Sequence, residues 1–326
     1  MDGREDQAVA PMRDPAPPAV PRPLYTTPLG TMYVADAMDL LRGQPDGSVR
    51  LVFTSPPFPL VTRKAYGNAP AGEYLDWFLP HAREIRRVLA PDGSLVLDLG
   101  DAWIEGTPTR AALPQRLLVA LLDGCGYHLC QEAASHNTAA MPAPAEWVNV
   151  RRCRLKSALE QVYWLSPSPF PEADNRRVLR PYSADMRRMI ARGTETRRRP
   201  SGHLQKAAIA KDRGGSIPDA VVACGNTDSR SRYITRCRAA GHGLHPARMP
   251  RPLAELWIGL CSQPGDLVVD PFAGSNITGA VAEALGRRWI CGDRDPGYAG
   301  DSRFRFEPEP VLIGDAARDG TGADPA

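Results

Sequence analysis

Residues 268–276 read Val268-Val-Asp-Pro-Phe-Ala-Gly-Ser-Asn276, and this stretch decides the class of fold. A short apolar run ends in an acid, a turn with proline and glycine follows, and helical spacing resumes from Thr278 to Leu285. Such a strand, turn and helix brings backbone N–H groups close to a ligand. The turn lacks the Gly-x-Gly-x-x-Gly pattern of a dinucleotide site, so it gives little support to a pyrophosphate cradle.

A second strand signal with an acid at its end follows this turn. Trp289-Ile-Cys-Gly-Asp293 places a carboxylate where nucleoside-binding folds hold the ribose hydroxyls. Asp270, at the end of the first strand, could receive a positively charged ligand group. Each acid could instead cap a helix, because aspartate is common at that position. The spacing of the two acids favours nucleoside binding.

The same alternation of strand and helix signals extends towards the N-terminus. Helical spacing covers Tyr74 to Leu89, with large apolar side chains near one face. The strand signals are Leu51 to Phe53, Leu95 to Leu99, Gln161 to Leu165 and Leu267 to Val269. This order predicts an α/β fold with a mainly parallel sheet.

Length and composition set the outer limits. The chain has 326 residues, of which 43% are hydrophobic, and this can fill one large domain with an insertion or two domains. No apolar run reaches the roughly 18 residues of a membrane helix, and no apolar segment opens the chain. Seven cysteines without a Cys-x-x-Cys pair fit a reduced compartment. We therefore expect a cytoplasmic protein.

The net charge of +3 conceals a strongly basic region. Residues 187–238 contain 13 basic and four acidic residues, so this region carries +9 and the remainder −6. The region is either a solvated basic insertion or a surface for nucleic acid. Charge alone leaves both interpretations open.

Ser55-Pro-Pro-Phe58 follows the strand signal that ends at Phe53. Two prolines stiffen the turn and remove two N–H donors, which leaves nearby carbonyl groups as fixed acceptors. The serine adds a hydroxyl and the phenylalanine a flat apolar face. This set suits a planar group with an exocyclic –NH₂, although a proline-rich turn after a strand needs no ligand.

Taken together, the two turns resemble motifs IV and I of the amino-methylating DNA methyltransferases. Motif IV precedes motif I and the basic region lies between them, as in the circularly permuted β group. Further segments resemble the PvuII-type cytosine-N4 methyltransferases from about Leu24 to Phe306; they are Met32 to Asp36, Lys64 to Asn68, Glu73 to Phe78, Glu146 to Asn149, Arg151 to Lys156 and His245 to Pro250. One departure is Asn276, where many relatives have the second glycine of Gly-x-Gly. Its side chain could crowd the cofactor or bond to it.

The resemblance implies a Rossmann-like, S-adenosylmethionine-dependent methyltransferase fold with a mostly parallel, seven-stranded sheet. Composition predicts disordered tails at residues 1–23, with six prolines within 11–23, and at residues 309–326, which are mostly polar and small. Between the tails, the resemblance implies a catalytic half (24–186), a target-recognition region (187–244) and a cofactor-binding half (245–308).

The resemblance further implies which residues form the site. The catalytic residues would be Ser55, Pro56, Pro57 and Phe58. The cofactor would contact Asp36, Phe53, Thr54, His245, Pro246, Arg248, Asp270, Phe272, Ala273, Gly274, Ser275, Asn276, Thr278 and Asp293, with Asp293 on the ribose and Asp36 on the adenine amino group. DNA would contact Arg63, Lys64, Arg197, Arg198, Arg199, His203, Lys206, Arg230 and Arg232. No metal is implied.

The function so implied is site-specific methyl transfer from S-adenosylmethionine to N4 of a cytosine flipped out of duplex DNA. Ser rather than Asp at position 55 favours cytosine N4 over adenine N6. An adenine-N6 DNA methyltransferase is the first alternative. Others are an RNA or small-molecule methyltransferase and a non-catalytic, nucleoside-binding DNA protein. The role would be in restriction-modification, with a restriction endonuclease as genetic partner, or independent of one. The sequence leaves open whether the protein is a monomer or a dimer.

Overall fold

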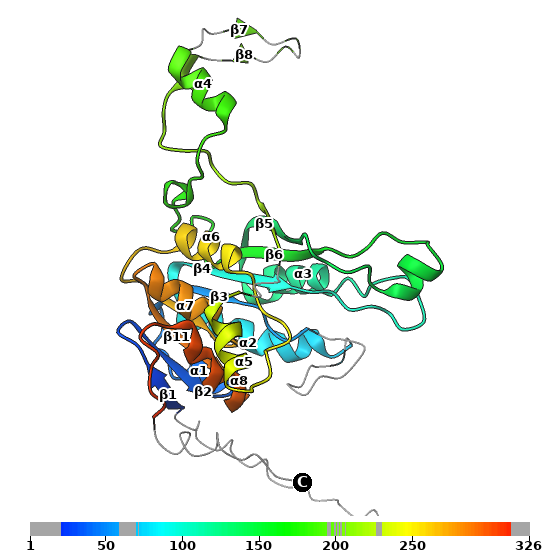
Figure 1. Cartoon of the computed structure of the whole chain (residues 1–326), viewed down its shortest axis with the longest axis vertical. Helices are drawn as coiled ribbons and strands as arrows, with labels where there is room; N and C mark the ends of the chain where they lie inside the picture. Colours follow the sequence, from blue (N-terminus) through cyan, green and yellow to red (C-terminus); the bar gives the residue numbers. More distant parts are fainter. Residues whose placement is uncertain are drawn as a thin grey trace, which may run out of the picture.

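The computed structural model describes residues 21–58, 70, 72–193, 197–198, 200, 202, 204–205, 207–225 and 230–313. Within these residues a nine-stranded sheet forms the centre of the molecule (Figure 1). Its strands, in order across the sheet, are β1 (Arg22–Thr26), β2 (Gly30–Val34), β11 (Arg288–Asp293), β10 (Leu267–Asp270), β3 (Val49–Thr54), β4 (Leu89–Leu99), β6 (Leu159–Ser166), β5 (His128–Asn137) and β9 (Val221–Cys224). Neighbours from β2 to β4 are parallel, as are β5 and β9, and the other three pairs are antiparallel.

The predicted α/β fold with a mostly parallel sheet is confirmed. The expected seven strands correspond to the run from β2 to β5, and β1 and β9 extend the sheet at its two edges. Strand β1 begins at Arg22, inside the stretch expected to be a tail, because Leu24 and Tyr25 are buried.

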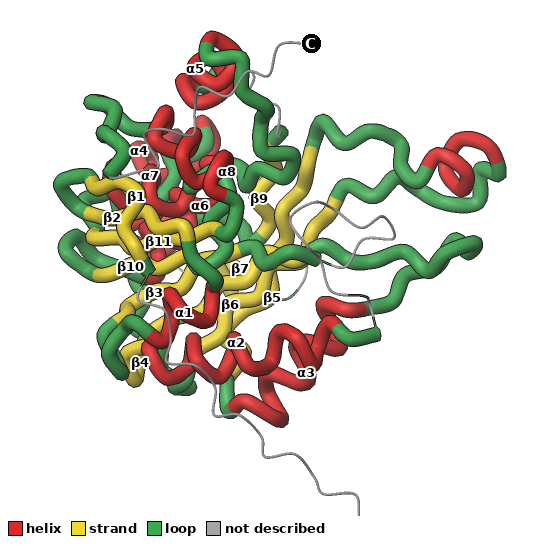
Figure 2. The backbone as a smooth tube through the Cα atoms, turned by 90° about the horizontal axis from the view of Figure 1, so that it is seen from below, coloured by secondary structure: helices red, strands yellow, loops and turns green. Residues whose placement is uncertain are grey.

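Helices cover both faces of the sheet (Figure 2). On one face lie α1 (Ala37–Arg42), α2 (Tyr74–Val88) and α3 (Leu113–Cys125), and on the other α6 (Arg251–Cys261) and α7 (Ile277–Ala284). The remaining elements are α4 (Ala184–Arg192), α5 (Arg232–Ala239), α8 (Pro296–Asp301), β7 (Arg197–Arg198), β8 (Leu204–Gln205) and the short helices η1 (Glu146–Val150), η2 (Asn175–Val178), η3 (Ala207–Ala210) and η4 (Ser302–Arg305).

Strand β3 shows why the sheet has two cores. Leu51 and Phe53 pack in the cluster that contains α6 and α7, whereas Val52 packs with α1, α2 and α3. Successive side chains of a strand point to opposite faces, so a strand between two helical layers needs an unbroken apolar run. This is why short apolar runs in the sequence identified β3, β4, β10 and β11.

The region expected to recognise the target, residues 187–244, is divided in the structure. Its later part belongs to the body, because β9 pairs with β5, and Tyr233, Ile234 and Cys237 of α5 pack against Phe304. The earlier part, with α4, β7 and β8, projects from the body (Figure 1). Arg180 and Ser216 exchange two backbone hydrogen bonds at the base of this projection, which we call the α4 projection.

A search of the described residues for membrane-spanning helices finds no helix with the length and apolar character to cross a bilayer.

Candidate active site

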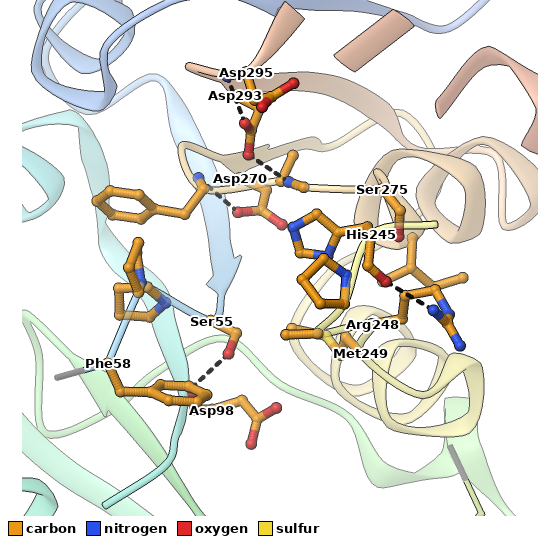
Figure 3. A pocket seen from close by; sticks show the side chains of 18 of the residues that line it. Ser55, Phe58, Asp98, His245, Arg248, Met249, Asp270, Ser275, Asp293 and Asp295 are labelled. Carbon is orange, nitrogen blue, oxygen red and sulfur yellow. Dashed lines mark hydrogen bonds between the residues drawn. The ribbon is translucent and has the colours of Figure 1, made fainter. Parts of the chain in front are cut away.

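One cavity opens at the carboxyl ends of the neighbouring strands β11, β10, β3 and β4, where open α/β sheets bind their ligands. Its volume is about 560 Å³. Asp293 and Asp295 lie at one end and Ser55, Phe58 and Asp98 at the other (Figure 3). The two turns singled out in the sequence therefore face the same space.

Asp270 lines the cavity and joins two parts of its wall. Its Oδ1 accepts from Thr54 Oγ1 at 2.6 Å and from the backbone N of Phe272 at 3.1 Å, and its Oδ2 accepts from Thr278 Oγ1 at 2.6 Å. The sequence suggested a carboxylate that receives a charged ligand group. In the structure, both oxygens join the end of β3 to the turn after β10.

Burial raises the pKa of Asp270 from 3.8 to about 6, although hydrogen bonds from Thr278, Thr54 and Phe272 oppose the shift. Between these two values the folded protein holds a proton that the unfolded chain has released. Its contribution to the free energy of unfolding is therefore fully present below pH 4 and falls as the pH rises towards 6.

We expect Asp270→Asn to remove this pH dependence. Any loss from altered hydrogen bonds lowers the free energy of unfolding of the Asn variant by a constant amount at every pH. As the pH rises from about 4 to about 6, the difference between the two proteins should shift by about 3 kcal/mol in favour of the Asn variant, because only wild type loses the contribution of the bound proton. Urea unfolding at several pH values measures the difference. Parallel curves for the two proteins would contradict the assignment.

Gly274 shapes the turn after β10. Its φ of +51° is a left-handed conformation, and a Cβ here would lie 2.9 Å from Nε2 of His245. Its N–H donates to Asp293 Oδ2 at 2.8 Å, and Asp293 Oδ1 accepts from the N of Asp295 at 2.9 Å. Burial raises the pKa of Asp293. A side chain at 274 would clash with the imidazole, so glycine allows the turn and His245 to lie this close.

His245 closes this part of the cavity. Its ring meets Tyr298 edge-on, with centroids 4.6 Å apart, and its carbonyl accepts from Arg248 Nη1 at 2.7 Å. Burial lowers the pKa of the imidazole, so the neutral form is favoured. The segment from His245 to Pro250 thus lines the cavity opposite the glycine turn.

Asn276 does not crowd the cavity. It is fully buried, its Oδ1 accepts from Gly279 N at 2.9 Å as the N-cap of α7, and its Nδ2 donates to Tyr25 Oη at 3.2 Å. Its φ of +53° is one that asparagine tolerates better than most residues. The side chain therefore caps α7 behind the turn and is not among the residues that line the cavity.

The turn after β3 presents Ser55 and Phe58. Ser55 Oγ donates to the carbonyl oxygen of Asp98 at 2.9 Å. The Phe58 ring packs against Gly100, where an added Cβ would lie 2.8 Å from the ring. Because the hydroxyl has one proton and two lone pairs, this bond leaves Ser55 as an acceptor on the cavity side.

Asp98 is the main site residue that the sequence analysis missed. Its side chain is 4% exposed, lines the cavity, and its Oδ1 has no hydrogen-bond partner among the residues that the structure describes. Burial, and then the charge of Glu160, raise its pKa well above the usual range. The available signal was an acid inside the apolar run Leu95 to Leu99, next to the strand that carries Ser55.

The structure brings most of the predicted site residues together and separates a few. Those that line the cavity are Ser55, Pro56, Pro57, Phe58, His245, Pro246, Arg248, Asp270, Phe272, Ala273, Gly274, Ser275 and Asp293. Phe53, Thr54 and Thr278 are buried behind its wall, and Asp36 is the exposed N-cap of α1. Lining residues absent from the prediction include Glu160, Ser135, Asn137, Met249 and Asp295.

The predicted DNA contacts are only partly described. Arg63, Lys64, Arg199, His203 and Lys206, and the side chain of Arg197, lie outside the described residues. Arg198 and Arg230 are exposed. Arg232 pairs with Glu307 at 2.9 Å, so the structure uses it to hold α5 to the segment after η4.

Comparison with known proteins identifies the family. The family profile for N6/N4 methyltransferases, described as DNA methylase, matches residues 49–303, which include both turns and all the residues that line the cavity. The chain belongs to this family of DNA methylases. Type II methyltransferase M.PvuII of Proteus hauseri is 42% identical over 288 residues, covering 87% of this chain and 86% of that protein.

Other comparisons agree with this membership. Type II methyltransferase M.XycI of Xanthomonas campestris is 26% identical over 88% of this chain and 93% of that protein. Among solved structures, the PvuII DNA methyltransferase (cytosine-N4-specific) superposes with a TM-score of 0.72 and 37% identity, covering 87% of this methylase and 88% of that chain.

Proposed function

We propose that this methylase transfers a methyl group from S-adenosylmethionine to N4 of a cytosine flipped out of duplex DNA. One observation carries the proposal: Ser55, in the turn after β3, and Asp293, at the end of β11, face one cavity, and only β10 lies between these two strands. The relative M.PvuII, whose solved structure is titled cytosine-N4-specific, supports the choice of base.

The residues at the Asp293 end fit the cofactor. Gly274 lets the turn approach His245 closely at the cavity wall, and two carboxylates, Asp293 and Asp295, are available to ribose hydroxyls or to a charged amino group. Phe272 adds an apolar side chain to the wall. S-adenosylmethionine, when bound, supplies a methyl group activated by a sulfonium. Asp36 lies outside the cavity and is left out of the proposed cofactor contacts.

The residues at the other end fit a planar amine. The lone pair of an exocyclic cytosine nitrogen is delocalised into the ring, so the nitrogen is a poor nucleophile. Ser55 Oγ and the carbonyl of Pro56 would accept hydrogen bonds from its two N–H groups and draw the nitrogen towards tetrahedral geometry. Phe58 would stack on the base, and the unused oxygen of Asp98 stands beside Ser55 for the polar edge of the ring. Positioning and fixed dipoles thus provide the catalysis.

Analysis of the product tests the proposal. The protein is incubated with methyl-labelled S-adenosylmethionine and mixed duplex DNA, and the DNA is digested to nucleosides. We expect N4-methylcytosine at one sequence. N6-methyladenine as the only product would overturn the base assignment, and cofactor binding without any transfer would favour a non-catalytic DNA-binding protein.

We further propose that the α4 projection recognises the target sequence. It contains Arg187, Arg188, Arg192 and Arg198, with η3 and the two-stranded β7–β8 unit, on a segment that leaves the body (Figure 1). A separate basic segment can contact both phosphates and base edges without disturbing the cavity. In this view the protein acts in restriction-modification, with a cognate endonuclease as genetic partner.

The α4 projection can be deleted at its base, where its two ends already lie side by side. Arg180 and Ser216 already exchange two hydrogen bonds, of 2.9 and 2.8 Å, so a short Gly-Ser linker can replace residues 181–215. We expect the variant to fold and bind S-adenosylmethionine as wild type does, and to lose site-specific methylation. Calorimetry and methylation mapping measure both. Retention of the same modified site would refute the role, and lost cofactor affinity would show that the deletion damaged the body.

A further inference from the structure

A second segment projects from the sheet near the cavity. Residues 138–158 connect β5 to β6 and carry η1 near their outer end; we call them the β5–β6 arm. Both views show the arm extending away from the body (Figures 1 and 2). None of these residues was included among the predicted DNA contacts.

The arm starts at the rim of the cavity. Asn137, the last residue of β5, and Glu160, the second residue of β6, both line the cavity together with Ser55 and Asp98. A nucleotide that enters the cavity at this end remains joined to its duplex on both sides. The duplex must therefore pass within reach of the arm.

The surface of the arm combines positive charge with exposed apolar side chains. Its charged residues are Arg151, Arg152, Arg154, Lys156 and Glu146. Met141, Val150 and Leu155 are 77%, 70% and 89% exposed. This mixture of basic and exposed apolar side chains suits phosphates together with sugars and base faces.

The arm is held against the loop that follows β4 and by a contact within itself. The guanidinium groups of Arg110 and Arg154 lie over the Trp103 ring, 4.7 and 4.3 Å from its centroid, and Arg154 also donates to the carbonyl of Pro108. Further out, Arg151 pairs with Glu146 at 2.7 Å. An anchored arm presents its surface in one orientation, which lowers the entropy cost of binding.

Arg152 differs from its basic neighbours. It is exposed, and within the described part of the chain no ion pair or hydrogen bond of its guanidinium is found, whereas Arg151, Arg154 and Lys156 each donate to a protein oxygen. Its φ of +52° is a conformation that glycine adopts without strain and arginine does not. Backbone strain of this kind clusters at functional sites.

We propose that the β5–β6 arm is a second DNA-contacting surface, which holds the duplex beside the flipped nucleotide through Arg152 on a phosphate and Leu155 against the sugar and base faces. This inference rests on the proposed function. A protein partner would use the same exposed apolar residues, but the charge of the arm and its origin at the cavity rim favour DNA.

Substitution at Arg152 separates binding from folding. Arg152→Gly removes the charge and relieves the positive φ, so the melting temperature should stay the same or rise. Affinity for duplex DNA should fall roughly fivefold to tenfold at about 0.1 M salt, and the slope of log Kd against log salt should fall by about one unit. Arg288→Ala is the control, because Arg288 is exposed at the start of β11, away from the strand ends that form the cavity.

Leu155 allows a charge test at one position. Because it is 89% exposed, Leu155→Lys and Leu155→Glu should both fold. We expect the Lys variant to bind duplex at least as tightly as wild type and the Glu variant to bind at least tenfold more weakly. Fluorescence anisotropy with a labelled duplex measures both, and sedimentation velocity reports association between protein chains.

Wild-type DNA affinity in Arg152→Gly, or equal affinity of the two Leu155 variants, would overturn the arm proposal. So would a change in sedimentation alone, which would indicate a protein interface. Product analysis with the wild-type protein tests the proposed function separately from the arm proposal. If wild type forms N4-methylcytosine and the Arg152 and Leu155 variants bind duplex DNA with wild-type affinity, only the arm proposal is refuted.

Discussion

Replacing Ser55 by alanine is expected to lower the single-turnover rate of methyl transfer about a hundredfold or more, in line with the loss of one positioned hydrogen-bonding group. The hydroxyl donates to the carbonyl of Asp98 and so keeps its lone pairs towards the cavity. The contact with the base amino group should strengthen as that nitrogen becomes tetrahedral. An interaction of this kind affects kcat rather than binding.

The measurement for Ser55→Ala is rapid quench with enzyme in excess over a duplex that carries the mapped site. Cofactor affinity by calorimetry and the melting temperature should stay at wild-type values. Ser48→Ala is the matched control, because that hydroxyl also donates to a main-chain carbonyl, that of Pro45 at 2.7 Å, before β3 begins. An unchanged rate in Ser55→Ala would remove the proposed role of the hydroxyl.

The central strands could be predicted from the sequence because helices cover both faces of the sheet. A strand between two helical layers must be apolar throughout, as Leu51 to Phe53 and Leu267 to Val269 are, and such runs are visible without an alignment. Strand β5 was not predicted. Its sequence, from His128 to Asn137, is largely polar, and much of it is only partly buried, so no run or alternation marks it.

Contacts between segments far apart in the sequence explain why the surroundings of Asp98, Asn276 and Arg232 could not be predicted. Asp98 reaches the cavity because β4 lies parallel to β3. In the sequence, the apolar run around it predicts only a buried strand. Asn276 stands within a recognisable motif, yet its left-handed backbone turns the side chain towards Tyr25. Arg232 lies in the basic region, but only the fold places Glu307 beside it. Motifs identify the segments of a site, and tertiary contacts decide which side chains face the ligand.

The hydrogen bonds of Asp270 connect the two ends of the cavity. Thr54, which donates to Oδ1, is the residue before Ser55, and Thr278, which donates to Oδ2, lies in the first turn of α7. The two turns therefore share one buried carboxylate, and the protein fixes the position of Ser55 relative to the turn after β10 before any ligand binds. Such preorganisation is what positional catalysis requires.

Replacing Asp293 by alanine should have the second-largest effect, a loss of about 1–3 kcal/mol in S-adenosylmethionine affinity. That is about fivefold to 150-fold in Kd, and DNA affinity should not change. Asp293 ends β11 at the cavity, with its oxygens held by the N–H groups of Gly274 and Asp295, so the carboxylate is fixed for ribose hydroxyls.

Alanine at position 293 also removes those two backbone contacts, so the loss could arise from a loosened turn. Asp293→Asn is the matched variant, because it keeps the shape and one oxygen, and it should lose less affinity than Asp293→Ala. S-adenosylhomocysteine lacking one ribose hydroxyl separates the two causes: if Asp293 holds that hydroxyl, removing both partners should cost little more than removing either one. Additive losses in calorimetry would assign Asp293 to the turn, and unchanged affinity in the alanine variant would exclude it from the cofactor site.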